Sequence, residues 1–420
     1  MTSYTPDIGI AGVGITSAIG QGRAAFTDAL FQGRARFTVM ARPGRQCNLS
    51  TGDGGSRQGC STGFLGAEIA QLSMPPRVSK ATLRTASFSE QVALATLQEA
   101  WDDAQLEDVD PARIGLVVGG SNFQQRELVQ AHQAYRTRVE FLRPTYGMTF
   151  MDSDLCGLCT EHFAIEGLAH SVGGASASGQ LAVIHAAQAV SSGQVDVCIA
   201  LGALMDLSFW ECQGLRALGA MGSTRYADEP ALAARPFDRD RDGFIYGEAC
   251  AAVVVERLGT SGQRGVVPYA RLSGWATRID RNRNPNPSLQ GEIAVIGKAL
   301  QHAGISAEAI DYINPHGSGS VIGDETELQA IHASALAHAP LNATKSITGH
   351  GLSAAGAVEV VATVLQMREG RLHPTRNLDN PVDTTLPWVG GQAIPQRIHH
   401  ALSISIGFGG INTAVCLQRL

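Results

Sequence analysis

Three side chains capable of acid–base or nucleophilic chemistry stand among glycines and other small residues. Ser176 lies in VGGASASG (172–179), directly before an apolar run, His316 lies in NPHGSGS, and His350 lies in TKSITGHGLSAAGAVE. A serine on a tight turn before a helix faces free backbone N–H groups, which can stabilise a developing negative charge. Taken alone, Ser176 is better explained as a helix N-cap.

The two histidines favour a functional site. Each stands where an expected strand gives way to a helix, and each is bordered by glycine. Parallel α/β folds place their ligands at this end of their strands. We therefore interpret both as functional, whereas His170, His185 and His338 have the settings of ordinary helix or loop histidines.

Two further segments carry aromatic or charged groups. Phe408 in GFGG stands at a glycine-rich turn and, on its own, is explained as a turn aromatic that fills the core. The segment RPFDRDRDGFIYGE leads from a loop into an expected buried strand. We expect its acidic side chains to pair with its arginines and brace the fold, the residues being Asp238, Asp242, Glu248, Arg235 and Arg241.

The elements that must position these groups alternate between strand and helix. We expect strands at 8–14, 114–120, 195–203, 248–256, 269–279, 309–317, 401–410 and 411–418. We expect helices at 22–33, 87–104, 178–192, 292–303, 323–338 and 353–368. Uniformly apolar strands that alternate with helices indicate an α/β protein with a parallel sheet covered on both faces. Loop-like segments at 41–64 and 281–288 interrupt the pattern, and the order of elements suggests a duplicated unit.

Composition excludes several classes of protein. The 420 residues carry 32 Lys+Arg and 38 Asp+Glu, a net charge of −6, which argues against a basic nucleic-acid-binding surface. We see neither an apolar run of the roughly 18 residues that a membrane span needs nor an N-terminal targeting signal, so we expect a soluble cytoplasmic protein. Cys156 and Cys159 lack a second cysteine pair or a histidine cluster nearby, so we expect no metal.

Taken in chain order, the motifs resemble those of the β-ketoacyl-acyl-carrier-protein synthases, a family of thiolase fold. That family carries a nucleophile turn, an HGT motif, a TKS…GH…AAG…E segment and a GFGG-N turn, which here read GGASASG, NPHGSGS, TKSITGHGLSAAGAVE and GFGGIN. The resemblance implies an α/β, thiolase-like fold of duplicated βαβαβαββ halves that form a five-layer αβαβα architecture. It also implies an N-terminal half (1–255), a C-terminal half (256–420) and a homodimer.

The same resemblance assigns roles to individual residues. It implies a set of catalytic residues that meet at one pocket: Ser176, His316, His350, Lys345, Glu359 and Phe408. The lysine and the glutamate would brace the two histidines, and the phenylalanine would cover the pocket. Ser318 and Ser320 stand where the family has threonines, and their hydroxyls can still bind the phosphopantetheine arm of a carrier protein. The substrate thioester arrives on that arm, so no tightly bound cofactor is implied.

One departure from the family changes the expected chemistry. Family members carry cysteine where this chain has Ser176. A cysteine at a helix N-terminus ionises readily, whereas a serine hydroxyl stays protonated unless a base removes its proton, so acyl transfer to this position is slowed. Two histidines that donate hydrogen bonds to a thioester oxygen still stabilise the enolate that forms when a malonyl group loses CO₂.

With this departure, the chain resembles the stand-alone decarboxylases of polyketide β-branching cassettes. The resemblance implies conversion of malonyl-acyl-carrier protein to acetyl-acyl-carrier protein, with Ser176 either hydrogen-bonded to the substrate or transiently acylated. It implies an acyl carrier protein as partner, and an HMG-CoA-synthase-like enzyme that shares this carrier.

Two other functions stay open on sequence alone. A catalytically silent partner of an active ketosynthase, like the chain-length factors, also lacks the cysteine, although such proteins usually lose the histidines too. A serine-dependent acyltransferase is the second alternative. A G-x-S-x-G hydrolase and a dinucleotide-binding protein fail on spacing, because Ser178 and Ser17 stand where those motifs need glycine.

Overall fold

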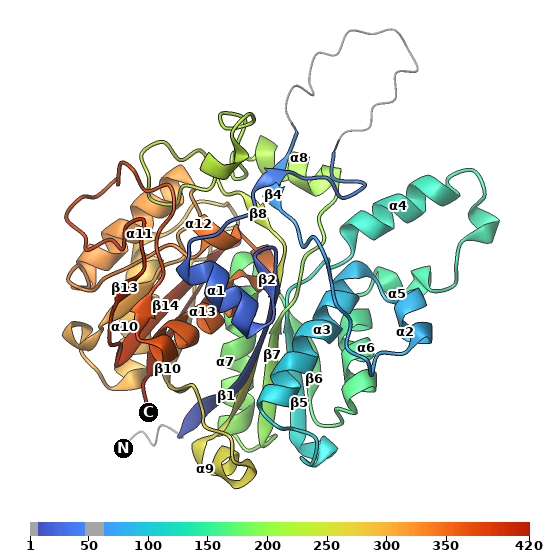
Figure 1. Cartoon of the computed structure of the whole chain (residues 1–420), viewed down its shortest axis with the longest axis horizontal. Coiled ribbons are helices and arrows are strands. Elements are labelled where there is room, and N and C mark those ends of the chain that lie inside the picture. Colours follow the sequence, from blue (N-terminus) through green and yellow to red (C-terminus); the bar gives the residue numbers. More distant parts are fainter. Residues whose placement is uncertain (1–6, 47–62) are drawn as a thin grey trace, which may run out of the picture.

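The computed structural model describes residues 7–46 and 63–420 (Figure 1). The strands of the main sheet are β1 (Ile8–Ser17), β2 (Gly20–Gln21), β5 (Ile114–Gly119), β6 (Ala169–Val172), β7 (Val197–Gly202), β9 (Ala249–Arg257), β10 (Ala270–Ile279), β11 (Tyr312–Asn314), β14 (His400–Gly407) and β15 (Ile411–Gln418). The remaining strands are β3 (Thr38–Val39), β4 (Leu65–Ala67), β8 (Tyr246–Gly247), β12 (Arg371–Leu372) and β13 (Ile394–Pro395). The helices are α1 (Arg23–Phe31), α2 (Lys80–Thr85), α3 (Phe88–Asp103), α4 (Gln125–Tyr135), α5 (Tyr146–Thr149), α6 (Asp152–Phe163), α7 (Ser178–Ser191), α8 (Phe209–Ala217), α9 (Leu258–Ser261), α10 (Leu289–Ala303), α11 (Val321–Ala333), α12 (Lys345–Thr348) and α13 (Ala355–Glu369).

The main sheet is mixed, so the prediction of a parallel sheet is wrong. Its strand order is β11-β14-β15-β10-β1-β9-β7-β5-β6. Strand β5 is parallel to β6 and β7, and β11 is parallel to β14, while β1, β9, β10 and β15 pair antiparallel with their neighbours. An apolar run reports burial on both faces of a strand, and burial does not fix strand direction.

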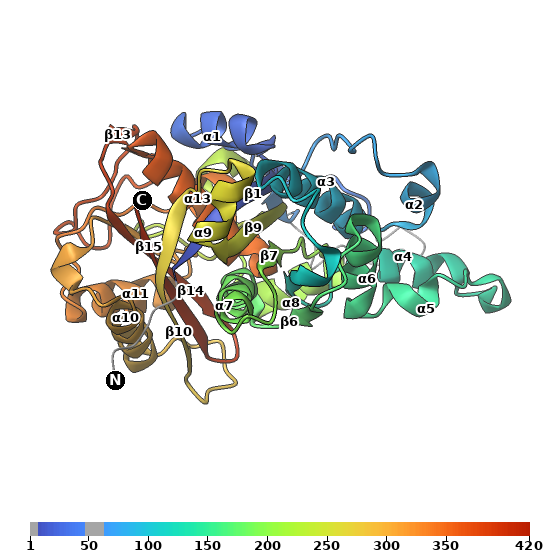
Figure 2. The ribbon, with the colours of Figure 1, turned by 90° about the horizontal axis from the view of Figure 1, so that it is seen from below.

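The elements stack in five layers, as the thiolase-like prediction requires (Figures 1 and 2). Helices α3 and α6 cover the sheet half that contains β1, β9, β7, β5 and β6, and helices α10 and α11 cover the half that contains β10, β15, β14 and β11. Helices α7 and α13 pack against each other and against strands of both halves. None of the helices in the described ranges is long and apolar enough to span a membrane.

The two central helices approach each other closely, because small residues line their contact. A Cβ atom built on Gly179 of α7 would lie 2.7 Å from the backbone nitrogen of Ala357 in α13. Side chains on both helices are buried on nearly every face, which explains why their sequences are apolar and Ala-rich throughout. This packing fixes the N-terminal end of α7, which follows Ser176.

Expected and observed elements agree best where a strong local signal marks the boundary. Helix α3 begins after Ser87, whose hydroxyl forms a capping box with Glu90. The strand expected at 309–317 is shorter than predicted and ends at Asn314, and a loop carries the chain to Ser320. The helix that follows also ends earlier than expected, at Ala333.

A small second sheet lies beside the candidate site. Strands β3 and β4 pair antiparallel, and β4 pairs parallel with β8 through Gly66 and Tyr246. The expected loop at 41–64 therefore stands between paired strands. Residues 47–62 of this loop lie outside the described residues.

Candidate active site

The two sequence-predicted histidines meet edge to face in the interior. The ring centroids of His316 and His350 lie 5.4 Å apart, with an angle of 81° between the ring planes. His316 stands in the loop after β11, and His350 follows α12, so separate segments bring the rings together. Their side chains are buried, which excludes bulk water from the space around them.

Hydrogen bonds define which nitrogen of each imidazole carries a proton. Lys345 Nζ lies 3.4 Å from His316 Nδ1, and an ammonium group has donors only, so this Nδ1 is an acceptor. His350 Nδ1 accepts a 3.1 Å hydrogen bond from the backbone N–H of Leu352. A neutral imidazole with Nδ1 as acceptor carries its proton on Nε2. Both rings therefore have an Nε2–H available as a donor.

Burial keeps these imidazoles neutral. Desolvation lowers the pKa of both His316 and His350 well below its usual value, and the charge of Lys345 lowers each pKa further. The neighbouring His350 contributes a smaller lowering to the pKa of His316. At neutral pH, the site is consequently a pair of uncharged N–H donors.

Lys345 lies beside His316, and its predicted role of bracing the histidines stays a prediction. Its ammonium group donates hydrogen bonds to the backbone carbonyl of His316 and to the carboxyl group of Glu359 on α13. Burial raises the pKa of Glu359 to about 7, and the contact with Lys345 acts in the opposite direction. These contacts join α12, α13 and the His316 loop in one buried group.

Ser176 lies on the short 3₁₀ turn η3 (Ala175–Ala177) before α7. The N-cap interpretation of Ser176 is wrong, because the N-cap positions of η3 and α7 are Gly174 and Ala177 and neither helix start has a side-chain cap. The hydroxyl of Ser178 instead accepts a 2.8 Å hydrogen bond from the N–H of Gly174 and donates one of 2.7 Å to the carbonyl of Ala175. The local turn is thus closed without the Ser176 hydroxyl, which is left for other partners.

Contacts between elements place the turn that carries Ser176 beside the segment that follows His350. The turn η3 contacts the 3₁₀ turn η7 (Leu352–Ala354), which begins two residues after His350. Ala175 has a φ of +48°, a left-handed conformation that non-glycine residues rarely adopt. Such backbone strain persists where the surrounding packing enforces it, and it is common at functional turns.

Ser318 and Ser320 stand in the loop between β11 and α11. The Ser320 side chain caps α11, accepting a 3.1 Å hydrogen bond from the N–H of Gly323. The Ser318 oxygen accepts a 3.2 Å hydrogen bond from the N–H of Ser320. Each hydroxyl still has its own proton to donate, and both side chains are half-buried.

Phe408 belongs to the turn between β14 and β15, and its side chain is 40% exposed. The interpretation as a turn aromatic that fills the core is therefore wrong. Gly409 and Gly410 in the same turn have φ values of +86° and +79°, which explains why this turn needs glycine. The predicted role of Phe408 above the pocket stays a prediction.

Two acidic residues that were not singled out in the sequence hold the His316 loop. The carboxylate of Glu327 accepts hydrogen bonds from the N–H groups of His316 (2.6 Å) and Gly317 (2.8 Å). Asp324 accepts a 3.0 Å hydrogen bond from the N–H of Gly319. Burial raises the pKa of Glu327 to about 8 and that of Asp324 to about 6. The run GDETE, which follows the histidine motif within an apolar helix, is the sequence signal for them.

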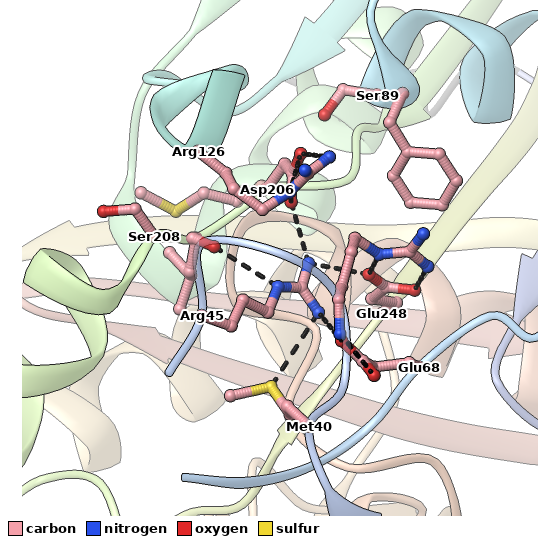
Figure 3. Close-up of polar contacts among 12 residues, drawn as sticks. Met40, Arg45, Glu68, Ser89, Arg126, Asp206, Ser208 and Glu248 are labelled. Carbon is pink, nitrogen blue, oxygen red and sulfur yellow. Dashed lines mark hydrogen bonds and ion pairs between the residues drawn. The ribbon is translucent and has the colours of Figure 1, made fainter. Parts of the chain in front are cut away.

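The prediction that acidic side chains and arginines within residues 235–248 pair with one another is correct only in part. Arg235 pairs with Asp238 at 3.2 Å, as expected. Asp242 instead accepts a hydrogen bond from the Ser223 hydroxyl. Glu248 pairs with two arginines outside the segment, Arg42 and Arg45, in a buried cluster (Figure 3). A sequence motif could not reveal these partners, because they lie about two hundred residues earlier in the chain.

This fold and this arrangement define the class of protein: the chain belongs to the β-ketoacyl synthase family. Residues 5–261 match the family described as Beta-ketoacyl synthase, N-terminal domain, and residues 269–379 match Beta-ketoacyl synthase, C-terminal domain. The predicted family and thiolase-like fold are therefore confirmed.

Comparison with individual proteins shows which members of the family this chain is similar to. The chain is 60% identical to "Polyketide biosynthesis malonyl-ACP decarboxylase PksF" of Bacillus subtilis (strain 168), over 99% of this chain and 97% of that protein. It is 31% identical to "3-oxoacyl-(acyl-carrier-protein) synthase 2" of Coxiella burnetii, over 85% of this chain and 88% of that protein. Among solved structures, a β-ketoacyl synthase from Burkholderia phymatum STM815 superimposes with a TM-score of 0.87 at 26% identity, over 99% of this chain and all of the other.

Proposed function

We propose that this protein decarboxylates malonyl-acyl-carrier protein to acetyl-acyl-carrier protein in polyketide biosynthesis. The observation that carries the proposal is the pair of buried, neutral imidazoles, each with Nδ1 bound as an acceptor and Nε2–H available as a donor. The 60% identity to a relative named as a malonyl-ACP decarboxylase supports the same assignment.

The chemistry follows from where negative charge develops. The bond between the carboxylate carbon and the α-carbon of the malonyl group breaks, CO₂ leaves, and the electron pair becomes an enolate whose charge lies on the thioester oxygen. Hydrogen bonds from His316 and His350 to that oxygen strengthen as the charge grows, so they stabilise the transition state more than the substrate. A proton from water then adds to the α-carbon and gives the acetyl thioester.

Ser176 explains why the reaction stops at the acetyl thioester. A condensing enzyme first carries an acyl group on a thiolate, and a serine hydroxyl is not ionised at neutral pH. Neither imidazole has Nδ1 free to act as a base, because Lys345 and the N–H of Leu352 occupy those atoms. In this proposal, Ser176 donates a hydrogen bond to the substrate.

In this proposal, the remaining site residues bind the carrier arm, cover the departing carboxylate and hold His316 in place. Ser318 and Ser320 use their remaining hydroxyl protons to bind the phosphopantetheine arm of the carrier protein. Phe408 excludes water from the departing carboxylate, which favours its loss as neutral CO₂. Lys345 and Glu359 hold His316 in place through the contacts of the buried ammonium group.

The proposal extends to partners and setting. An acyl carrier protein delivers the substrate, and an HMG-CoA-synthase-like enzyme takes the acetyl carrier onward in the cytoplasm. The chain functions as a homodimer of subunits built from an N-terminal half (1–255) and a C-terminal half (256–420). Exposed apolar side chains on the arm that contains α4 and α5 support self-association, namely Val139, Phe141, Met148, Phe150 and Met151.

Mass spectrometry of the carrier protein tests the activity. Incubation with malonyl-carrier protein is expected to remove the mass of CO₂ and leave the acetyl form. His350→Ala removes one of the two donors, and loss of one such donor typically costs about 10²–10³ in rate. His399→Ala, at an exposed histidine, serves as the control. An unchanged malonyl carrier with the wild-type protein would contradict the proposal.

A further inference from the structure

His350 is held by the small sheet of β3, β4 and β8. The N–H of His350 donates a 2.7 Å hydrogen bond to the carbonyl of Ile245, and the N–H of Gly247 donates one of 3.1 Å to the carbonyl of His350. Both backbone polar groups of this histidine are therefore bound to one strand segment. A Cβ atom on Gly247 would lie 2.0 Å from the carbonyl oxygen of Thr348, so only glycine permits this approach.

The residue that follows β8 is a buried, fully bonded carboxylate. Glu248 has no exposed surface and receives hydrogen bonds from Arg42 Nε and Nη2, each at 2.8 Å, and from the N–H of Ile69 at 2.6 Å. Its Oε1 also lies 2.6 Å from Nη2 of Arg45. The carboxylate thus fixes the end of β8 to two other segments of the chain (Figure 3).

Arg45 is the centre of this cluster and is itself fully buried. Its guanidinium group contacts Asp206 at 2.7 Å and Glu68 at 3.0 Å in addition to Glu248. It also lies 5.1 Å from the centroid of the Tyr246 ring, on the strand that binds His350. The Tyr246 hydroxyl donates a 2.6 Å hydrogen bond to the carbonyl of Met205, next to Asp206.

The charges of the cluster nearly balance. Three arginines and four carboxylates take part, the residues being Arg42, Arg45, Arg126, Glu68, Glu127, Asp206 and Glu248. Because the guanidinium groups and carboxylates already bind one another, the cluster is poorly suited to hold a ligand. Buried ion pairs contribute little net stability, and their best-supported use is to specify one geometry. The geometry specified here is that of β8.

We infer that Glu248, held by Arg42 and Arg45, is a positioning residue for His350. It fixes β8, and β8 sets the backbone of His350 and hence the direction of its Nε2–H. The Phe244 ring, which packs edge to face on His350 at 4.9 Å between centroids, belongs to the same segment. This inference rests on the proposed decarboxylation, in which the placement of that donor sets the rate.

Glu248→Gln tests the inference, and the chain offers a matched control. Glu256 is also fully buried, pairs with Arg264 at 2.6 Å, and lies near the other end of β9. A misplacement of about 1 Å at a reacting group costs about 10²-fold in rate. We expect Glu248→Gln to lower kcat about 10- to 100-fold with little change in KM, because binding of the arm is unaffected. Glu256→Gln is expected to change neither.

Imidazole nitrogen NMR supplies the readout that a general loss of stability would not give. In Glu248→Gln the ¹⁵N signals of His350 are expected to shift, while those of His316, which Glu327 and Lys345 hold, stay in place. Equal kcat values for the two glutamine variants, or equal shifts for both histidines, would overturn the inference.

A second variant covers the case in which Glu248→Gln does not fold. Tyr246→Phe removes the hydroxyl bound to Met205 and leaves the rest of β8 unchanged. The same selective shift of the His350 signals, with a smaller fall in kcat, is then expected, and unshifted His350 signals would overturn the inference. If the wild-type protein releases no CO₂, the proposed function fails, whereas the NMR comparison still decides whether the cluster positions His350.

Discussion

Ser176 is the residue at which the family resemblance predicts a departure from a condensing enzyme, an oxygen atom in place of the cysteine sulfur. The turn around it is closed by Ser178, so its backbone does not depend on the Ser176 side chain. We expect Ser176→Cys to fold normally and to acquire condensing activity, because a thiol at this turn ionises more readily than a hydroxyl. Mass detection of a β-ketoacyl product from an acyl donor and malonyl-carrier protein measures this gain.

The matched variant for that experiment is Ser176→Ala. It removes the hydroxyl without adding a nucleophile, so it is expected to retain decarboxylation and to form no condensed product. A Ser176→Cys protein that decarboxylates but never condenses would show that more than the serine restricts the chemistry.

Glu292, in the first turn of α10, gives a second prediction at this scale. It is fully buried, and both carboxyl oxygens lack a hydrogen-bond partner among the described residues. Burial, together with the nearby Glu327 and Asp280, raises its pKa to about 9. The folded protein keeps this proton, whereas the unfolded chain releases it near a pKa of about 4.3. The free energy of unfolding therefore falls as pH rises from about 5 to 9.

Glu292→Gln is expected to remove this pH-dependent loss. The thermal midpoint of the variant relative to the wild type should be higher at pH 8.5 than at pH 4.5, where the folded protein keeps the proton and the unfolded chain is only about half ionised. Thermal unfolding followed by circular dichroism at the two pH values measures the difference. A constant difference at both pH values would show that Glu292 is ionised in the folded protein.

At the scale of elements, the contact between α7 and α13 fixes the N-terminal end of α7, which follows the turn that carries Ser176. A Cβ atom on Gly179 would lie 2.7 Å from the nitrogen of Ala357 and 2.9 Å from the carbonyl of Ser353. Gly179→Ala is expected to lower the free energy of unfolding by about 1–3 kcal/mol, as overpacking does, despite the higher helix propensity of alanine. Chemical denaturation measures this change.

Gly157 in α6 is the matched control for Gly179. A Cβ atom there meets nothing within 4 Å. Gly157→Ala is therefore expected to stabilise the protein by about 0.5–1 kcal/mol through helix propensity alone. We therefore expect the free energy of unfolding to fall in Gly179→Ala and to rise in Gly157→Ala. Changes of the same sign in both variants would contradict the packing explanation.

Elements also show what the sequence could and could not predict. Apolar runs predicted the major strands and helices, because that signal is local, and the capping box at Ser87 in the structure lies where one predicted helix begins. Strand direction was not predictable, since a strand buried on both faces is apolar whichever way it runs. Arg42 and Arg45 looked like loop residues, because Glu248, the carboxylate that pairs with both of them, lies about two hundred residues later in the chain. The division between residues 255 and 256 stays a prediction.

At the scale of the whole molecule, one feature stands out from the body of the fold. The arm that contains α4 and α5 projects from the side of the molecule that carries the edge strand β6 (Figure 1). The side chains of Val139 and Phe141 on this arm are 70% and 68% exposed. An exposed apolar arm next to an unpaired strand edge is suited to contact a second copy of the chain.

Phe141→Asp is expected to separate the proposed homodimer, because it places a charge on the apolar arm. The wild-type protein should have twice the chain mass of 44.2 kDa in light scattering, and the variant should approach the single-chain value. Val267→Asp is the control, since Val267 is 84% exposed and lies outside the arm, before β10. A wild-type monomer would contradict the homodimer. A Phe141→Asp dimer would place the interface elsewhere.

Because β6 leads into the turn that carries Ser176, we also expect the monomeric variant to decarboxylate more slowly than the Val267→Asp protein.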